Sequence, residues 1–182
     1  MSTRTLFTSE DLWKMVADGS RYELSKGELL PMSPVGMEHG GIVMALGALL
    51  RSYAMKKGLG LVGTEIGFRL GQNPDTVRAP DVAFVARHRL PADGVPKKFA
   101  HFPPDLAVEV LSPEDTASEI LRKIEEYLTA GVALAWVVDP ATRTVTVYRS
   151  LRDIQILSAD QELDGGEVLP GFRTMVAEIF SL

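Results

Sequence analysis

The feature that most constrains the fold of this chain is a short apolar run, residues 106–111, which one acid, Glu109, interrupts. A strand that is apolar throughout belongs in the centre of a sheet whose two faces are both covered. A carboxylate at such a position costs several kcal/mol if it stays charged and unpaired, or it must be protonated. The run therefore predicts a layered fold that contains an acid in need of a counter-charge.

The patterning on either side of this run predicts one domain, residues 1–182, with three helices and a sheet. The expected helices begin near Thr8, Ile42 and Ala117 and end at Gly19, Gly58 and Gly131. Strands are expected near 60–70, 80–86, 105–111, 134–139, 144–149 and 153–157, and a hairpin over 21–30 with a three-residue loop, 25–27. We therefore expect an α/β fold (an α+β mixed sheet) with an N-terminal helix and hairpin.

The composition excludes several classes of protein. The chain has no cysteine, which excludes disulfide scaffolds, cysteine-ligated metal sites and thiol nucleophiles. No apolar run approaches the ~18 residues of a membrane span and no secretion signal is visible, so we expect a cytoplasmic protein with no membrane contact. With 19 basic and 24 acidic residues the net charge is −5, so phosphate binding must come from a local site, a metal ion or an oligomer.

A second acid, Asp81, opens another apolar strand directly after Pro80. Two carboxylates about 4 Å apart repel by ~4 kcal/mol at an effective dielectric constant of about 20. A divalent cation such as Mg²⁺ removes both this repulsion and the burial cost, because it accepts hard oxygen ligands. The alternative is that the acids lie on an edge strand in solvent, or pair with a structural arginine such as Arg78.

Lys123 lies at the margin of the apolar stripe of the third predicted helix, about 60° from Ile120 on a helical wheel. A lysine at such an edge can run its stem along the core and place its ammonium at the mouth of a sheet. The alternative is a solvated lysine that pairs with Glu119, one helical turn earlier.

Several short motifs follow one another in a characteristic order along the chain. They are Tyr22-Glu23-Leu24 with Gly27-Glu28, His39 before a helix, Ala79 to Val85, Leu106 to Pro113, Lys123 with Tyr127, Ala130-Gly131-Val132, Trp136 to Pro140, and Leu169 to Phe172. This ordered set resembles the Uma-type putative endonuclease family, formerly domain of unknown function 820, within the PD-(D/E)XK nuclease superfamily. The resemblance covers nearly the whole chain and rests on the set rather than on any single motif.

The resemblance implies a restriction endonuclease-like core, in which a central mixed sheet flanked by helices carries a Mg²⁺ site at one edge, with Mn²⁺ as a plausible substitute. It implies that Asp81 and Glu109 are catalytic acids that bind the metal. The lysine expected two residues after that glutamate is Leu111 here. Lys123, on the following helix, is implied to take its place.

The resemblance also implies further contributors to the site. Glu23 matches an additional acid from the N-terminal part of superfamily members, as a direct or water-mediated ligand. The backbone carbonyl of Val110 would be a further ligand, and Lys123 would orient the attacking water or neutralise charge in the transition state. His39, beside the start of the long helix, is a candidate phosphate contact; a capping or loop-packing role is the alternative.

Basic residues bracket the loop 91–104 between the two acidic motif strands, among them Lys97 and Lys98. This loop could grip a nucleic-acid backbone near the metal, or it could be an ordinary solvated loop. Phe99 and Phe102 within it could stack on bases or anchor the loop to the domain. His88 and His101 are expected to be surface residues.

Together these features favour a Mg²⁺-dependent DNA endonuclease that hydrolyses phosphodiester bonds. We expect a homodimer, because one domain contains one active centre and cutting both strands takes two. The alternative is a catalytically inactive nucleic-acid-binding or protein-interaction module on the same fold, which the negative net charge and the displaced lysine favour. A third hypothesis, a hydrolase that uses Asp81 and Glu109 on a glycosidic bond, is disfavoured by the few aromatic residues.

Overall fold

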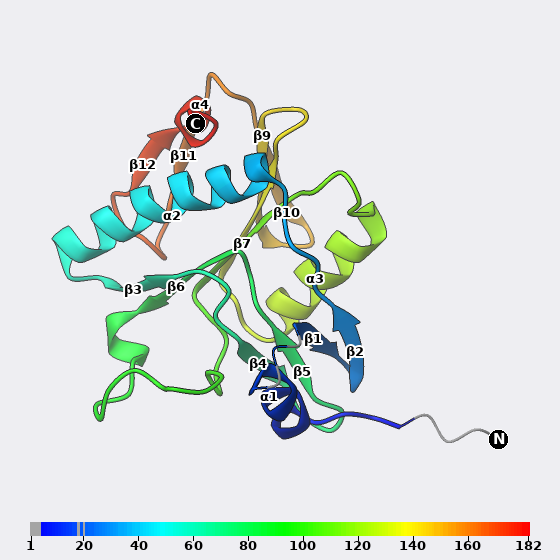
Figure 1. The fold of residues 1–182 in the computed structure, drawn as a ribbon. Helices are drawn as coiled ribbons and strands as arrows, with labels where there is room; N and C mark the ends of the chain where they lie inside the picture. The colour runs from blue at the N-terminus through cyan, green and yellow to red at the C-terminus, as the bar shows by residue number, and fades with distance from the viewer. Residues whose placement is uncertain (1–4, 18, 20) are drawn as a thin grey trace.

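The computed structural model describes residues 5–17, 19 and 21–182 (Figure 1). Its helices are α1 Ser9–Ala17, α2 Met37–Lys57, α3 Ala117–Thr129 and α4 Val176–Ile179, with a 3₁₀ turn at Arg87–Arg89. Its strands are β1 Tyr22–Ser25, β2 Glu28–Pro31, β3 Gly60–Gly63, β4 Phe68–Gly71, β5 Thr76–Arg78, β6 Val82–Ala86, β7 Leu106–Val110, β8 Leu134–Asp139, β9 Thr144–Ser150, β10 Asp153–Leu157, β11 Glu162–Asp164 and β12 Arg173–Met175. None of the helices in these residues is long and apolar enough to cross a membrane.

The larger sheet has the strand order β10-β9-β8-β7-β6-β3. Every residue of β7 is buried, which confirms the prediction of a central strand covered on both faces. On one face Val108 belongs to a core cluster with Leu46 of α2, and on the other Ala107 packs in a cluster with Ile124 of α3. Because successive strand residues point to opposite faces, Glu109 shares the α3 face with Ala107. The predicted mixed sheet flanked by helices is confirmed (Figure 1).

Helix α3 connects β7 to β8, which run parallel, whereas the other strand pairs of this sheet are antiparallel. A parallel pair needs such a crossover because both strands start at the same end of the sheet. The helix begins at a capping box, in which the Thr116 hydroxyl accepts from the Glu119 backbone N–H and the Glu119 carboxylate accepts from the Thr116 backbone N–H. The box defines the first turn of the helix that covers Glu109.

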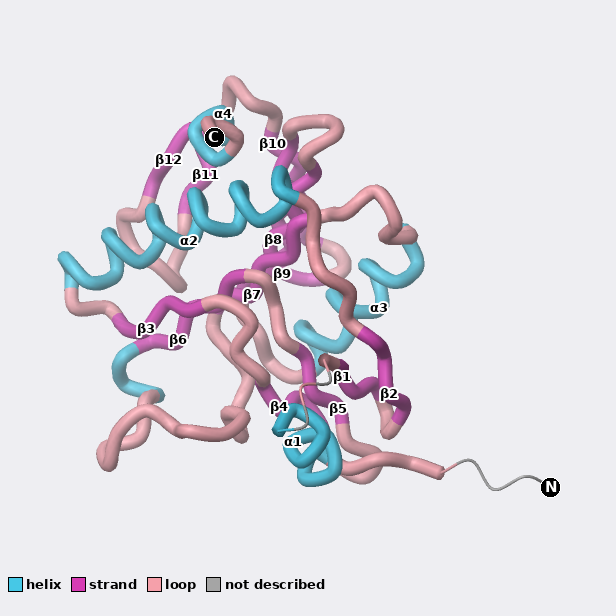
Figure 2. Tube along the Cα trace, in the orientation of Figure 1, coloured by secondary structure: helices cyan, strands magenta, loops and turns pink. Residues whose placement is uncertain are grey.

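A smaller sheet with the order β2-β1-β5-β4 lies beside the larger one and carries α1 (Figure 2). Leu12 of α1 packs in a buried cluster with Leu24 of β1 and Val77 of β5. The β1–β2 hairpin closes with two loop residues rather than the predicted three, Lys26 and Gly27, whose φ angles are 48° and 81°. Two positive φ angles in a two-residue loop match the twist of the flanking strands.

The stretch 60–70, predicted as one strand region, divides between the two sheets. β3 pairs with β6 in the larger sheet, whereas β4 pairs with β5 in the smaller one. Between them Glu65 adopts a φ of 52°, which turns the chain. The strands β5, β11 and β12 are absent from the prediction, because three residues are too few to show an alternation of apolar and polar side chains. Helix α2 begins at Met37 rather than near Ile42, so it includes Gly40 and Gly41, which precede the first residue of the apolar pattern.

Candidate active site

The acid in the central strand, Glu109, receives two hydrogen bonds from α3. It is 4% exposed, and its Oε2 accepts a hydrogen bond from Lys123 Nζ at 2.9 Å. Its Oε1 accepts a hydrogen bond from the Tyr127 hydroxyl. Residues one helical turn apart lie on the same face of a helix, so Lys123 and Tyr127 approach the carboxylate together. The crossover helix therefore supplies both donors to the buried acid.

The second strand acid, Asp81, lies directly before β6. The antiparallel register of β6 and β7, continued by one residue, places it opposite Glu109. Residues in such positions have Cβ atoms ~5 Å apart. Asp81 Oδ2 accepts a hydrogen bond from the Val110 backbone N–H at 2.7 Å and lies 3.4 Å from His39 Nε2. The two acids singled out by the sequence are therefore neighbours in the structure.

Glu23 reaches the same cluster from β1, where a buried arginine holds it. Arg78 is 2% exposed; its terminal nitrogen donates to Glu23 Oε2 at 2.7 Å and its Nε donates to Glu126 Oε2 at 2.6 Å. Glu23 Oε1 accepts from the Ala79 backbone N–H at 2.8 Å, and Oε2 lies 3.7 Å from Lys123 Nζ. The arginine considered as an alternative partner for the strand acids is thus bound to two other carboxylates.

Burial and neighbouring charges shift several pKa values in this cluster. Burial disfavours the charged form of Glu109 and raises its pKa to about 7; the Lys123 ammonium opposes this rise, and the charges of Asp81 and Glu23 add to it. Burial lowers the pKa of Lys123, but Glu109 and Glu23 overcome this effect and hold the pKa above its ordinary value. The pKa of His39 is raised, chiefly by its hydrogen bond to Asp81. The charge of Glu109 therefore depends on the balance between its burial and the neighbouring Lys123 ammonium.

The residue types of this cluster fit a divalent cation. The charged members are the carboxylates of Glu23, Asp81, Glu109 and Glu126 and the cations of Arg78 and Lys123. With every carboxylate ionised and His39 neutral, these groups have a net charge of −2, and the oxygens of Asp81 and Glu109 are donors of the kind that Mg²⁺ accepts. In the described part of the chain, however, no three acids or histidines are grouped as ligands of one metal ion. Asp81 and Glu109 are therefore the better candidates for direct contact.

Two contributors to this cluster were missed as site residues by the sequence reasoning. The hydroxyl of Tyr127 binds Glu109, and Glu126 binds Arg78. A signal for Tyr127 exists, because its position one turn after Lys123 puts a polar group at the end of a buried aromatic side chain. No such signal exists for Glu126, since its partner arginine lies 48 residues away in the sequence.

His39 lies in the first turn of α2 and is buried. Its Nδ1 has no hydrogen-bond partner among the described residues. The N-cap residue, Gly36, has no side chain, and among the described residues no side-chain cap bonds the first-turn backbone N–H groups beside the histidine that contacts Asp81. His88 and His101 are exposed, as expected.

Comparisons with known proteins agree with this architecture. The sequence model of the Uma2 family, described as "Putative restriction endonuclease", matches residues 9–177. The crystal structure of a putative nuclease belonging to DUF820 from Anabaena variabilis resembles this chain with a TM-score of 0.85 and 20% sequence identity, over 96% of this chain and 98% of that chain. Among curated proteins none matches the sequence. The likeness confirms the predicted fold, and the family match confirms the predicted family.

Proposed function

The chain belongs to the Uma2 family of putative restriction endonucleases, and we propose on this basis that it is a Mg²⁺-dependent endonuclease that hydrolyses phosphodiester bonds of DNA. A nuclease is the class of activity that the family supports. The observation that carries the proposal is the convergence of Asp81, Glu109 and Lys123 at one end of the central strands. Cutting both strands of a duplex takes two such centres, so the proposed active form is a homodimer.

Asp81 and Glu109 would hold the divalent ion together with the backbone carbonyl of Val110, and Mn²⁺ would serve in place of Mg²⁺. When bound, the ion lowers the pKa of a water molecule and stabilises charge that develops on the phosphate. Glu23 would contribute through a water molecule, because both of its oxygens already accept hydrogen bonds from Arg78 and the backbone.

The remaining side chains would position the reacting groups. The side chain of Lys123 is 22% exposed, and its ammonium lies 2.9 Å from Glu109 Oε2. There it would orient the attacking water or neutralise charge on the phosphate. The Tyr127 hydroxyl restricts the rotation of the Glu109 carboxylate. At the start of α2, His39 and the free backbone N–H groups would bind the phosphate, because a helix N-terminus favours anions.

Cleavage of supercoiled plasmid by the purified protein tests this proposal. With Mg²⁺ or Mn²⁺ we expect nicking that EDTA stops, and we expect Asp81→Asn and Glu109→Gln to lose it while retaining the wild-type circular dichroism spectrum. Glu125→Gln changes an exposed acid of α3 and is the matched control that should cut like the wild type. Wild-type cleavage by both site variants would show that the site is assigned wrongly.

A catalytically inactive nucleic-acid-binding or protein-interaction module is the second candidate function. It is favoured because both oxygens of Glu109 and of Glu23 already accept hydrogen bonds, and because Leu111 stands where the superfamily has lysine. Calorimetric titration with Mn²⁺ separates the two candidates. The nuclease requires metal binding that Glu109→Gln abolishes, whereas the inactive module requires none.

A further inference from the structure

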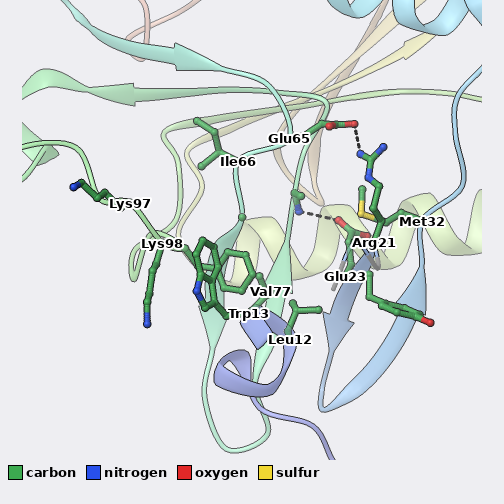
Figure 3. A pocket seen from close by; sticks show the side chains of 15 residues that line it. Leu12, Trp13, Arg21, Glu23, Met32, Glu65, Ile66, Val77, Lys97 and Lys98 are labelled. Atoms are coloured by element: carbon green, nitrogen blue, oxygen red, sulfur yellow. Dashed lines mark hydrogen bonds and ion pairs between the residues drawn. The ribbon is translucent and has the colours of Figure 1, made fainter. Parts of the chain in front are cut away.

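A pocket of about 400 Å³ lies beside the candidate active site, between α1, the smaller sheet and residues 97–99 of the loop 91–104 (Figure 3). This volume falls within the ~300–1,000 Å³ of small-ligand pockets. Leu12 and Val77 contribute buried apolar surface. The rings of Trp13 and Phe99 also line the pocket and meet edge to face, with centroids 5.0 Å apart. The interior is therefore apolar and aromatic.

Cationic side chains stand around this aromatic interior. Lys97 and Lys98 are exposed, and Lys98 Nζ lies 6.0 Å from the centre of the Trp13 ring. Elsewhere on the pocket wall Arg21 donates to Glu65 at 2.6 Å (Figure 3). The pocket thus suits a ligand that has a flat apolar part and carries negative charge beside it.

One residue, Glu23, belongs both to this pocket and to the candidate active site. Its side chain lines the pocket, where it accepts the hydrogen bond from the Ala79 backbone (Figure 3). Its other oxygen lies 3.7 Å from Lys123 Nζ, and that ammonium binds Glu109 at 2.9 Å. The Glu23 carboxylate therefore connects the pocket to the groups proposed to act on the phosphate.

We infer that this pocket binds the base of an unpaired nucleotide adjacent to the phosphate that is cleaved; the inference rests on the proposed function. Every nucleobase has flat faces on which aromatic side chains stack, and the phosphates attached to it match the lysines at the loop. A base within a duplex is stacked between its neighbours and enters a pocket only after it is extruded. The pocket therefore selects DNA that has single-stranded or distorted segments.

Photocrosslinking in the wild-type protein locates the base without any substitution. A short DNA strand with one 5-iododeoxyuridine is irradiated with the protein in EDTA, and the crosslinked peptides are identified by mass spectrometry. We expect the crosslink at Trp13, Lys98 or Phe99. A crosslink confined to residues outside the pocket, or no binding of the strand, would overturn the inference.

Fluorescence anisotropy with the same strand, alone and in a blunt duplex, measures the preference for unpaired DNA. We expect Trp13→Leu to weaken binding of the single strand about tenfold, and Lys98→Ala to weaken it about threefold, with smaller effects on the duplex. Lys57→Ala removes the same charge from the exposed end of α2 and is the matched control for the lysine. Equal losses for the two lysine variants would overturn the inference, even where Trp13→Leu fails to fold.

The inference about the pocket and the proposed nuclease activity can be refuted independently of each other. If the strand crosslinks to the pocket but no DNA is cleaved with Mg²⁺ or Mn²⁺, the proposed nuclease falls and the binding site stands. If plasmid is cleaved in a metal-dependent way, but the wild type binds strand and duplex equally and no crosslink forms in the pocket, the pocket inference alone is wrong.

Discussion

Replacement of Arg78 should cause a large loss of stability, because its side chain is buried between two carboxylates. Arg78→Met keeps a long side chain but removes the guanidinium between Glu23 and Glu126. The two N–O distances are 2.7 and 2.6 Å, and the arginine, Glu23 and Glu126 side chains are 2%, 6% and 10% exposed. The substitution would leave two carboxylates where water has little access.

The expected loss follows from this burial. Removing one partner of a buried ion pair costs ~3–5 kcal/mol, because the other charge stays behind without compensation. Two carboxylates lose the guanidinium here, although Glu23 keeps Lys123 at 3.7 Å and Glu126 keeps the hydrogen bond from Ser25, so we expect a loss of about 3–5 kcal/mol in the free energy of unfolding. Proteins have a total stability of ~5–15 kcal/mol, so this is a large share. The double variant Arg78→Met with Glu126→Gln should recover part of the loss, since one stranded charge is removed.

Arg21→Met is the matched control. Arg21 pairs with Glu65 at 2.6 Å, a distance as short as those of Arg78, but the two side chains are 48% and 51% exposed. An exposed pair contributes only ~0–1 kcal/mol, so the control should lose about 1 kcal/mol or less. Urea unfolding followed by circular dichroism gives both free energies. Equal losses for Arg78→Met and Arg21→Met would refute the view that burial, rather than distance, sets the strength of these pairs.

Two further predictions concern Glu109 and the start of α3. The pKa of Glu109 is raised to about 7 from an ordinary 4.5, so between these pH values the folded protein holds this proton more tightly than the unfolded chain does. The free energy of unfolding should therefore fall as the pH rises from about 4.5 to about 7. Urea unfolding in EDTA should show that Glu109→Gln removes this decline; an unchanged pH dependence would contradict the shift. Thr116→Ala breaks the capping box and should cost about 1 kcal/mol, whereas Thr116→Ser should be nearly neutral. Equal stability of these two variants in the same assay would show that the cap contributes nothing.

The central strands and their acids were predictable because burial on both faces leaves a direct trace in the sequence. β6 and β7 lie within the ranges predicted for them, and neighbouring antiparallel strands bring Asp81 and Glu109 together. The position of Lys123 on the edge of an apolar stripe indicated that it could turn toward the sheet. Each of these features can be recognised in one short, continuous stretch of sequence.

The hairpin of the smaller sheet was predictable from its turn, but strand β5, the pairing through it and its arginine were not. Arg78 joins Glu23 and Glu126, which lie 55 and 48 residues away in the sequence. Its strand, β5, has three residues and thus no recognisable alternation. A buried charge network of this kind depends on which distant strands pair, and that information is absent from any local window.

In the parallel pair β7–β8 with its crossover helix α3, a side chain can reach Glu109 from two different elements. A long side chain can approach it from within the strand, two residues after the acid, or from the helix, as Lys123 does. A lysine at either position would be able to bring its ammonium to Glu109. An alignment of two chains that differ in this way, position by position, would then show a missing lysine, even where both chains hold an ammonium beside the same glutamate.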